Sequence, residues 1–482
     1  MTNKIRLRDQ DLPAYAICFV GEVLWNMFAG NSKLLGFPIG PDRLFFGLGM
    51  LLLLLDPVEL RRQRLRLRPV HVAGGALALL AVLSGLEAGT FGTSYGFYAW
   101  LDRLAIPLLM FMLAPVIFRT ADRRDLLLRI LVLVGLYLGM TAIFEVVGPH
   151  ALVFPKFIMD RNVGIQFGRA RGPFTESEAD GIAMCQCGFA AALAATRLPG
   201  KWKRLSIATV GFCSVGILLT LTRSVWVGSA LGVAVVCLLT PALRKFLIPL
   251  ALAFAALIGI LLIALPSVRG DAGARAGTVR SLWDRENTNA AAIRIIEQHP
   301  LTGVGWVRFV VVSEKYVRQA RSYPITSIDI EVHNVTLGRA AELGLPGAGL
   351  WIFAVLAGPC LVFIRRRPAG DLAGWAIASM GGTCCWLVAI NLSPVPYPLP
   401  NLLVWLMSGI ALMPYLATAR DTDTSELGAN DAKDKAALDP APVRSQLRTA
   451  REIRPENVTA NHPNRGWRQR RWPVTFPKGP PH

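Results

Sequence analysis

The sequence has few charged residues for its length. Of its 482 residues, 17% are Asp, Glu, Lys or Arg and 53% are hydrophobic, whereas a soluble domain carries about 25% charged residues. A water-facing surface on a chain of this size needs more charge than that. The composition therefore excludes most soluble proteins and indicates an integral membrane protein.

Residue patterns for metal or disulfide chemistry are also scarce. The chain has six histidines, and its eight cysteines lie within or beside apolar runs, where thiols behave as small hydrophobes. Neither Cys185 with Cys187 nor Cys384 with Cys385 has partners at the spacing of a zinc site. We therefore expect no metal, no cofactor and no disulfide framework.

Long apolar runs, by contrast, recur along the whole chain. Runs of roughly 17–25 residues cross a bilayer as helices, and we count about twelve, of which 44–55 is short. They span residues 12–29, 44–55, 70–86, 98–118, 126–147, 179–196, 205–221, 224–240, 246–265, 335–363, 372–392 and 402–417. This pattern predicts an all-α, polytopic integral membrane protein.

Basic residues predict the orientation of these spans, because short cytoplasmic loops retain Lys and Arg. They precede the first run and follow the second, fourth, sixth, eighth and tenth, at 4–8, 61–68, 119–124, 197–204, 244–245 and 365–367. Both termini are therefore expected in the cytoplasm, with the protein in the inner (plasma) membrane. Topology then accounts for most of the net charge of +19, and no nucleic-acid partner is needed.

Two segments depart from the membrane pattern. Residues 418–482 are polar and lack any helical or strand period, so we expect a disordered cytoplasmic tail after a membrane domain of residues 1–417. The arginines at 465–471 could touch anionic lipid instead of lying in solvent. Residues 267–331 form a large loop that the alternation places outside, and long loops in tightly connected bundles usually carry function.

Several arginines lie at the outer ends of the predicted spans, against the topological bias. Arg169 and Arg171 belong to Gly-Arg-Ala-Arg-Gly-Pro-Phe at 168–174, Arg223 lies in a tight turn, and Arg294 lies in the large loop. Ionisable groups at the membrane edge mark function by default, and the guanidinium fork suits phosphate. We predict that this group holds a pyrophosphate; the alternative is contact with lipid headgroups.

A second motif begins where the loop re-enters the membrane, with His333, Asn334 and Glu342. A neutral imidazole there can take a proton from a hydroxyl near pH 7, although a histidine that caps the tenth helix is the alternative. The glycine-rich turn at 298–306 lacks the spacing of a phosphate loop. Thr175 and Glu178 fit a capping box, whereas carboxylates at 176–180 could otherwise bind sugar hydroxyls or a cation.

Together these motifs resemble the O-antigen ligase and O-antigen polymerase family, which includes exopolysaccharide polymerases. The match rests on Arg-Gly-Pro-Phe at 171–174, on Leu-Thr-Arg-Ser at 221–224, and on Arg294 followed by His-Pro-Leu-Thr-Gly-Val-Gly at 299–305, His333-Asn334 and Glu342-Leu-Gly344. It covers roughly residues 160–350. The order and spacing of the motifs are more specific than any one of them.

The resemblance implies a membrane-embedded, metal-independent glycosyltransferase of lipopolysaccharide or exopolysaccharide biosynthesis. Its donor would be an undecaprenyl-pyrophosphate-linked glycan on the outer face of the membrane, and its acceptor a glycan or a lipid. Carried over, Arg223 and Arg294 would bind the pyrophosphate and His333 would activate or organise the acceptor. Substrate contacts would come from Arg169, Arg171, Asn334 and Glu342.

Four questions stay open at this level. Residues 175–180 depart from an Asn-rich stretch common in the family, which leaves the sugar open, and the motifs do not separate ligase from polymerase. A lipid-linked-glycan flippase or exporter would also have about twelve spans, and a non-catalytic export component would share the topology. We expect neither an internal repeat nor charged residues along the middle of several helices, which favours the transferase.

Overall fold

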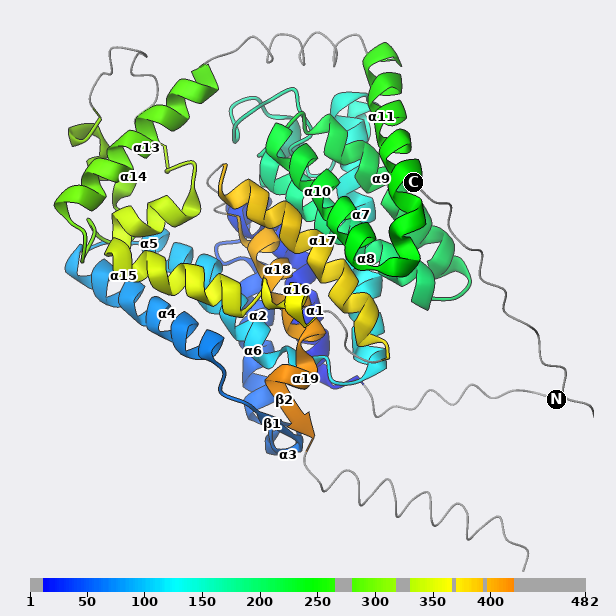
Figure 1. Cartoon of the computed structure of the whole chain (residues 1–482), viewed down its shortest axis with the longest axis horizontal. Helices are drawn as coiled ribbons and strands as arrows, with labels where there is room; N and C mark the ends of the chain where they lie inside the picture. The colour runs from blue at the N-terminus through cyan, green and yellow to red at the C-terminus, as the bar shows by residue number, and fades with distance from the viewer. Residues whose placement is uncertain (1–11, 265–279, 318–329, 366–369, 393–396, 420–482) are drawn as a thin grey trace, which may run out of the picture. The chain divides into compact units, whose positions relative to one another are not determined.

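The chain is almost entirely helical where its structure is described (Figure 1). The computed structural model describes residues 12–264, 280–317, 330–365, 370–392 and 397–419. Within these, the only sheet is an antiparallel pair of three-residue strands, β1 (Gln63–Leu65) and β2 (Ala417–Ala419). The all-α class is confirmed, whereas the predicted tail from residue 420 onward and the basic residues at 4–8 lie outside the described residues.

A helix lies at each of the twelve predicted apolar runs. In chain order these are α1 (Ala14–Trp25), α2 (Pro41–Leu54), α4 (Pro69–Glu87), α5 with α6 (Ser94–Trp100, Ile106–Ile117), α7 (Ala121–Val146), α8 (Ser177–Arg197), α9 (Lys201–Leu219), α10 (Arg223–Leu239), α11 (Leu247–Ala264), α15 with α16 (Val335–Ala357, Leu361–Ile364), α17 (Leu372–Ile390) and α18 (Pro398–Ala411). Seven of the described helices are long and apolar enough to cross a membrane, and α10 and α18 are shorter apolar helices. The chain is thus a multi-pass membrane protein, and the count of about twelve spans stays a prediction.

The large loop predicted at 267–331 contains a helix of its own, α13 (Arg280–Gln298). Its buried residues Thr288, Ala291, Ala292 and Ile295 recur every three or four positions, which is the period of an amphipathic helix. This face packs on α15, and the short helix α14 (Phe309–Val312) follows it. Residues 265–279 and 318–329 lie outside the described residues.

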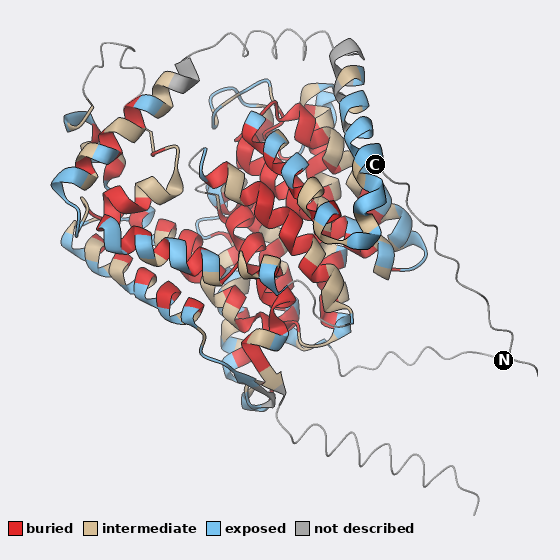
Figure 2. Cartoon of the chain, in the orientation of Figure 1, coloured by how far each residue is buried: buried red, intermediate tan, exposed pale blue. Residues whose placement is uncertain are grey.

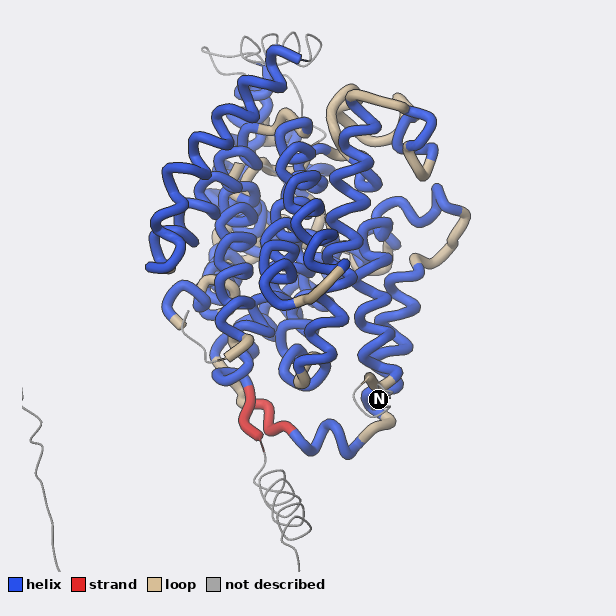
Figure 3. The backbone as a smooth tube through the Cα atoms, turned by 90° about the vertical axis from the view of Figure 1, so that its right-hand side faces the viewer, coloured by secondary structure: helices blue, strands red, loops and turns tan. Residues whose placement is uncertain are grey.

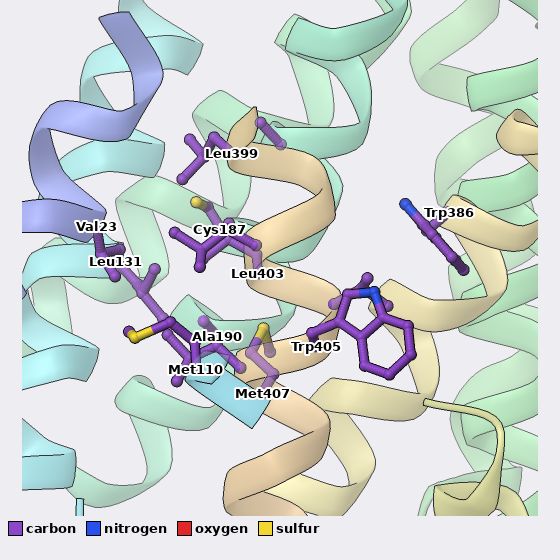
Figure 4. Close-up of a cluster of buried hydrophobic side chains, with 14 of the residues drawn as sticks. Val23, Met110, Leu131, Cys187, Ala190, Trp386, Leu399, Leu403, Trp405 and Met407 are labelled. Carbon is purple, nitrogen blue, oxygen red and sulfur yellow. The ribbon is translucent and has the colours of Figure 1, made fainter. Parts of the chain in front are cut away.

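Helix α18 packs on α6, α8 and α17, and its Leu399, Leu403 and Met407 contribute to the buried core (Figure 4). Burial is concentrated in these central helices, whereas α4 and α11 expose much of their surface (Figure 2). Lipid is as apolar as a side chain, so close packing holds such helices together. A Cβ atom on Gly232 of α10 would lie 2.7 Å from the carbonyl oxygen of Gly381 on α17.

Four of the predicted cytoplasmic loops, those after the second, fourth, sixth and tenth predicted spans, meet at one end of the helices. Arg123, after the fourth predicted span, pairs with Glu59 at 2.8 Å, and Arg124 pairs with Asp371 at 2.6 Å. Arg197, after the sixth span, also reaches Asp371, at 2.9 Å. The β1–β2 pair lies at this end too, below the helices in Figure 3. Basic loops that are far apart in sequence therefore share one end, as their alternation along the chain requires.

Candidate functional site

The opposite end brings together the segments that contain the predicted site residues. The side chain of Asn31 donates to the carbonyl of Pro173 at 2.8 Å, and the hydroxyl of Thr90 donates to the carbonyl of Trp306 at 2.7 Å. Asn334 donates to the carbonyl of Asn391 at 3.4 Å. These contacts join the connection after the first predicted span to the connection after the fifth, and the connection after the ninth to the connection after the third and to the end of the eleventh span.

Arg223 is exposed at the first position of α10, in a turn that is held on both sides. The preceding residue, Thr222, shares a 3.1 Å hydrogen bond with Ser177, and the following residue, Ser224, donates to Glu178 at 2.8 Å. Leu221 has a φ of +49°, which is uncommon for a residue other than glycine. A constrained backbone thus presents an exposed guanidinium.

Arg171 is placed very differently, because its side chain is completely buried. The guanidinium pairs with Glu145 at 3.3 Å and donates to the carbonyls of Ile158, Asp160 and Val163 at 2.6 to 2.7 Å. These contacts favour a role in holding the 158–171 loop. The substrate contacts predicted for Arg171 and for half-buried Arg169 stay predictions.

The predicted capping box at the start of α8 is wrong. The helix begins at Ser177, its N-cap is Glu176, and that residue makes no side-chain cap. Thr175 instead has a left-handed φ of +56°, and the carboxylate of Glu178 accepts from Ser224. Backbone geometry at Thr175 moves the helix start by one residue, which separates the two residues that a capping box would join.

Glu176 links this region to the segment before α15. Burial and, to a lesser degree, the nearby charge of Glu178 raise the pKa of Glu176 to about 8. Tyr397 hydrogen-bonds Glu176, and Glu331 lies close enough to interact with it electrostatically. The residues that follow the Arg-Gly-Pro-Phe motif and the residues that precede His333 therefore lie near each other.

His333 lies just before α15 and is partly buried. Its Nδ1 is buried and has no hydrogen-bond partner among the described residues. Burial lowers the pKa of the imidazole, Arg285 lowers it further, and Asp284 opposes them in part. The ring is therefore neutral near pH 7, which is the form that can accept a proton.

Arg285 is the residue that sequence reasoning missed. Its Nε is buried and has no partner within the described parts of the chain, and its charge acts on His333. Arg294 lies nine positions further along α13, about 13 Å at the rise of a helix, and donates to the carbonyl of Tyr316 at 2.5 Å. Arg285 shares a helical face with buried Thr288, Ala292 and Ile295, a period that was visible in the sequence.

The glycine-rich turn at 298–306 packs against the Glu342 motif. Val304 and Gly305 donate their amides to the carbonyls of Ala341 and Glu342 at 2.9 and 3.0 Å. Gly303 has a φ of +66°, and a Cβ atom there would lie 2.3 Å from the carbonyl carbon of Glu342. Only glycine fits this approach, so the two motifs occur together for a structural reason.

Asn334 and Glu342 also make contacts within the protein. Asn334 is the N-cap of α15, and its side chain accepts from the amide of Leu337 at 2.9 Å. Asn334, rather than His333, therefore caps this helix. Glu342 is buried and pairs with Arg339 at 3.3 Å. Their predicted contacts with substrate stay predictions.

A comparison with known protein families tests the resemblance inferred from the sequence motifs. Residues 208–352 match the family model described as O-antigen ligase. This segment belongs to the O-antigen ligase family. The matched range includes Arg223, Arg294, His333 and Glu342 and ends before α17. No curated protein matches the chain. The match confirms the resemblance and an O-antigen ligase-like function in polysaccharide biosynthesis.

Several ionisable residues are buried in the helices around the O-antigen ligase segment. Glu22 and Asp42 are buried in α1 and α2, and Asp180 is buried in α8. Asp102 and Arg103 lie in a π-helical turn, η2 (Leu101–Ala105), between α5 and α6. Asp42 and Asp180 lie in the first turns of their helices, so these residues do not contradict the expectation that charged residues are not spread along the middle of several helices. Among the described residues, no group of three or more His, Cys, Asp or Glu is placed to hold a metal.

Proposed function

We propose that this protein is a membrane-embedded glycosyltransferase that moves an undecaprenyl-pyrophosphate-linked glycan onto an acceptor hydroxyl. The observation that carries the proposal is the placement of two groups at one end of the helices. The side chain of Arg223 is exposed, and hydrogen bonds made by the residues before and after it hold its backbone. His333 has a buried Nδ1 without a hydrogen-bond partner in the described structure. That end is opposite the basic loops.

In this reaction the acceptor oxygen attacks the anomeric carbon of the donor glycan. The bond between that carbon and the pyrophosphate oxygen breaks, and undecaprenyl pyrophosphate leaves as an anion. Fixed cations stabilise the charge that develops on the leaving group. Arg223 and Arg294 supply these cations, with Arg285 as a further one because of its place beside His333.

The acceptor hydroxyl loses its proton to the imidazole of His333. Burial and Arg285 keep this ring neutral, so it enters the reaction as a base. Asn334 and Glu342 would contact the sugars, Arg169 would support the pyrophosphate, and Arg171 would act indirectly by holding the 158–171 loop. Because arginine replaces a metal in this scheme, transfer should persist in excess EDTA; activity restored by one divalent ion would contradict it.

The proposal includes a membrane placement. In this placement the chain crosses the inner membrane about twelve times. Both termini lie in the cytoplasm, the 267–331 loop lies outside, and residues 418–482 form a disordered tail. The gathering of basic loops at one end supports this. A membrane-impermeant thiol reagent should label Thr302→Cys, an exposed loop position, in spheroplasts and leave Ser445→Cys in the tail unlabelled. The reverse result would overturn the topology.

Transfer by the purified protein tests the function itself. A lipid-linked donor and a candidate acceptor should give a covalent product in detergent or liposomes. In a deletion strain, loss of capped lipopolysaccharide would indicate a ligase, whereas loss of long chains with single repeats retained would indicate a polymerase.

A lipid-linked-glycan flippase is the second candidate, and the buried ionisable residues of α1, α2 and η2 favour it over a non-catalytic export component. A flippase would move the donor between the leaflets of a liposome without forming a new glycosidic bond. Donor translocation without any transfer product would therefore replace the transferase proposal.

A further inference from the structure

The π-helical turn η2 interrupts the α5–α6 helix with two adjacent charged residues, which pair with different parts of the chain. Asp102 accepts from Arg43 of α2 at 2.6 Å. Arg103 pairs with Glu331, just before α15. Turns of this kind inside α-helices frequently occur at functional sites, and charges within a membrane helix are functional by default.

The ion pair between Arg103 and Glu331 is bidentate. One guanidinium nitrogen of Arg103 lies 2.7 Å from Oε1 of Glu331 and the other lies 3.3 Å from Oε2. The hydroxyl of Tyr95 donates to the same Oε1 at 2.7 Å. Burial alone would raise the pKa of Glu331, but the charge and hydrogen bonds of Arg103 lower it below its ordinary value. The carboxylate is therefore ionised and bound in one orientation.

His333 lies two residues after this anchored carboxylate. Between them, Val332 is buried in an apolar cluster with Ile295 and Phe309. On the other side, Asn334 is held as the N-cap of α15. The imidazole thus belongs to a short segment whose backbone is held before and after it.

We infer that Arg103 is a positioning residue for His333, because it binds Glu331 and thereby places the segment that holds the imidazole. Asp102 and Arg43 brace η2 on its other side. The inference rests on the proposed function, in which His333 accepts the proton. Arg103 and Glu331 also line a cavity of about 40 Å³ with Arg339 and Asn401, so an unpaired Glu331 side chain has room to turn away.

The test separates positioning from donor binding. Arg103→Gln and Glu331→Gln should lower kcat by about tenfold or more, because small misplacements of a catalytic group are costly, while KM for the lipid-linked donor changes little. The reversed pair, Arg103→Glu with Glu331→Arg, should recover a large part of kcat because it restores the ion pair. Glu331→Asp keeps the charge and should fall between wild type and Glu331→Gln.

Asp371→Asn is the matched control. It breaks a comparable ion-pair cluster with Arg124 and Arg197 at the opposite end, and kcat should stay near that of the wild type. Thermal unfolding shows which variants fold. If Arg103→Gln and Glu331→Gln do not fold, the same comparison of kcat and KM is made on the reversed pair and on Glu331→Asp, and it tests the inference in the same way.

Normal kcat in a folded Arg103→Gln protein, with transfer abolished in His333→Ala, would overturn this inference and leave the proposed function standing. A rise in donor KM without loss of kcat would also overturn it, because Arg103 would then bind donor. If His333→Ala retains transfer, the role of His333 as the base fails instead, while the transferase function stands. The positioning claim is then judged by the rate at which diethyl pyrocarbonate modifies His333: faster modification in Arg103→Gln supports it, and an unchanged rate overturns it.

Discussion

The hydroxyl of Ser224 donates a 2.8 Å hydrogen bond to the carboxylate of Glu178, and this bond ties the first turn of α10 to the first turn of α8. Together with the 3.1 Å contact between Ser177 and Thr222, it holds the residues on both sides of Arg223. The backbone of Arg223 is therefore positioned by its neighbours while its side chain is exposed.

Ser224→Ala should weaken the use of donor although it leaves Arg223 in place. Removing the hydroxyl takes a donor from a buried carboxylate, which costs about 1–3 kcal/mol, and loosens the turn. We expect a higher KM for the lipid-linked donor. The control is Ser229→Ala, a buried serine of the same helix whose hydroxyl contacts Cys385 at 3.6 Å. Equal KM values for both variants would show that the turn does not position Arg223.

Arg223 itself should show a graded response. Arg223→Ala should weaken donor use strongly, whereas Arg223→Lys keeps the charge, loses the planar fork and should fall between Ala and wild type. Binding of a lipid pyrophosphate and the transfer rate should be measured for each folded variant. If Lys and Ala behave alike, the fork geometry matters and the charge alone does not; if neither lowers donor use, Arg223 is not part of the site.

Arg285 and Arg294 should differ, because only Arg285 is seen to act on His333. Arg285→Ala removes a positive charge near the imidazole and should raise the pKa of His333. In a plot of transfer rate against pH, the limb where the rate falls at acidic pH should therefore move to higher pH. Arg294→Ala should weaken donor use and leave that limb where it was. A shift with Arg294→Ala but not with Arg285→Ala would assign the two arginines the other way round.

The transfer rate should depend on pH through His333. A base is active when neutral, and burial together with Arg285 lowers the pKa of His333 below its ordinary value of 6.5. The rate should therefore be flat near pH 7 and fall as the pH drops through that lowered pKa. His333→Ala should abolish transfer with the donor still bound. Substantial activity in His333→Gln would mean that the residue organises the acceptor, and near-normal activity in folded His333→Ala would remove it from the mechanism.

Arg171→Ala should destabilise the protein more than it affects any single kinetic step. Breaking a buried ion pair costs about 3–5 kcal/mol, and Glu145 would be left without the guanidinium at 3.3 Å. Arg171→Lys should rescue little, because one ammonium cannot reach the carbonyls of Ile158, Asp160 and Val163 together. Thermal unfolding in detergent measures this. An Arg171→Ala protein with normal stability and lost donor binding would show instead that Arg171 holds the pyrophosphate.

The sequence by itself determined the helical class, the places of the apolar helices and the grouping of basic loops at one end. Each of these depends on the polarity of a whole segment, and a segment's transfer into lipid is a sum over its residues. The order of the motifs at 221–224, 294–305 and 333–344 was enough to indicate the O-antigen ligase family.

The tertiary structure alone decided which charged side chains are available to a ligand and which are used by the protein. Arg171 and Arg223 look equivalent in sequence, yet one guanidinium is completely buried against Glu145 and three carbonyls and the other is exposed. Arg285 was missed because His333, whose pKa its charge lowers, is distant in sequence, and Arg103 gave no signal because its ion-pair partner Glu331 is distant too. Hydrogen bonds and ion pairs act over a few ångströms in space, so only the packing of the helices could reveal these pairs.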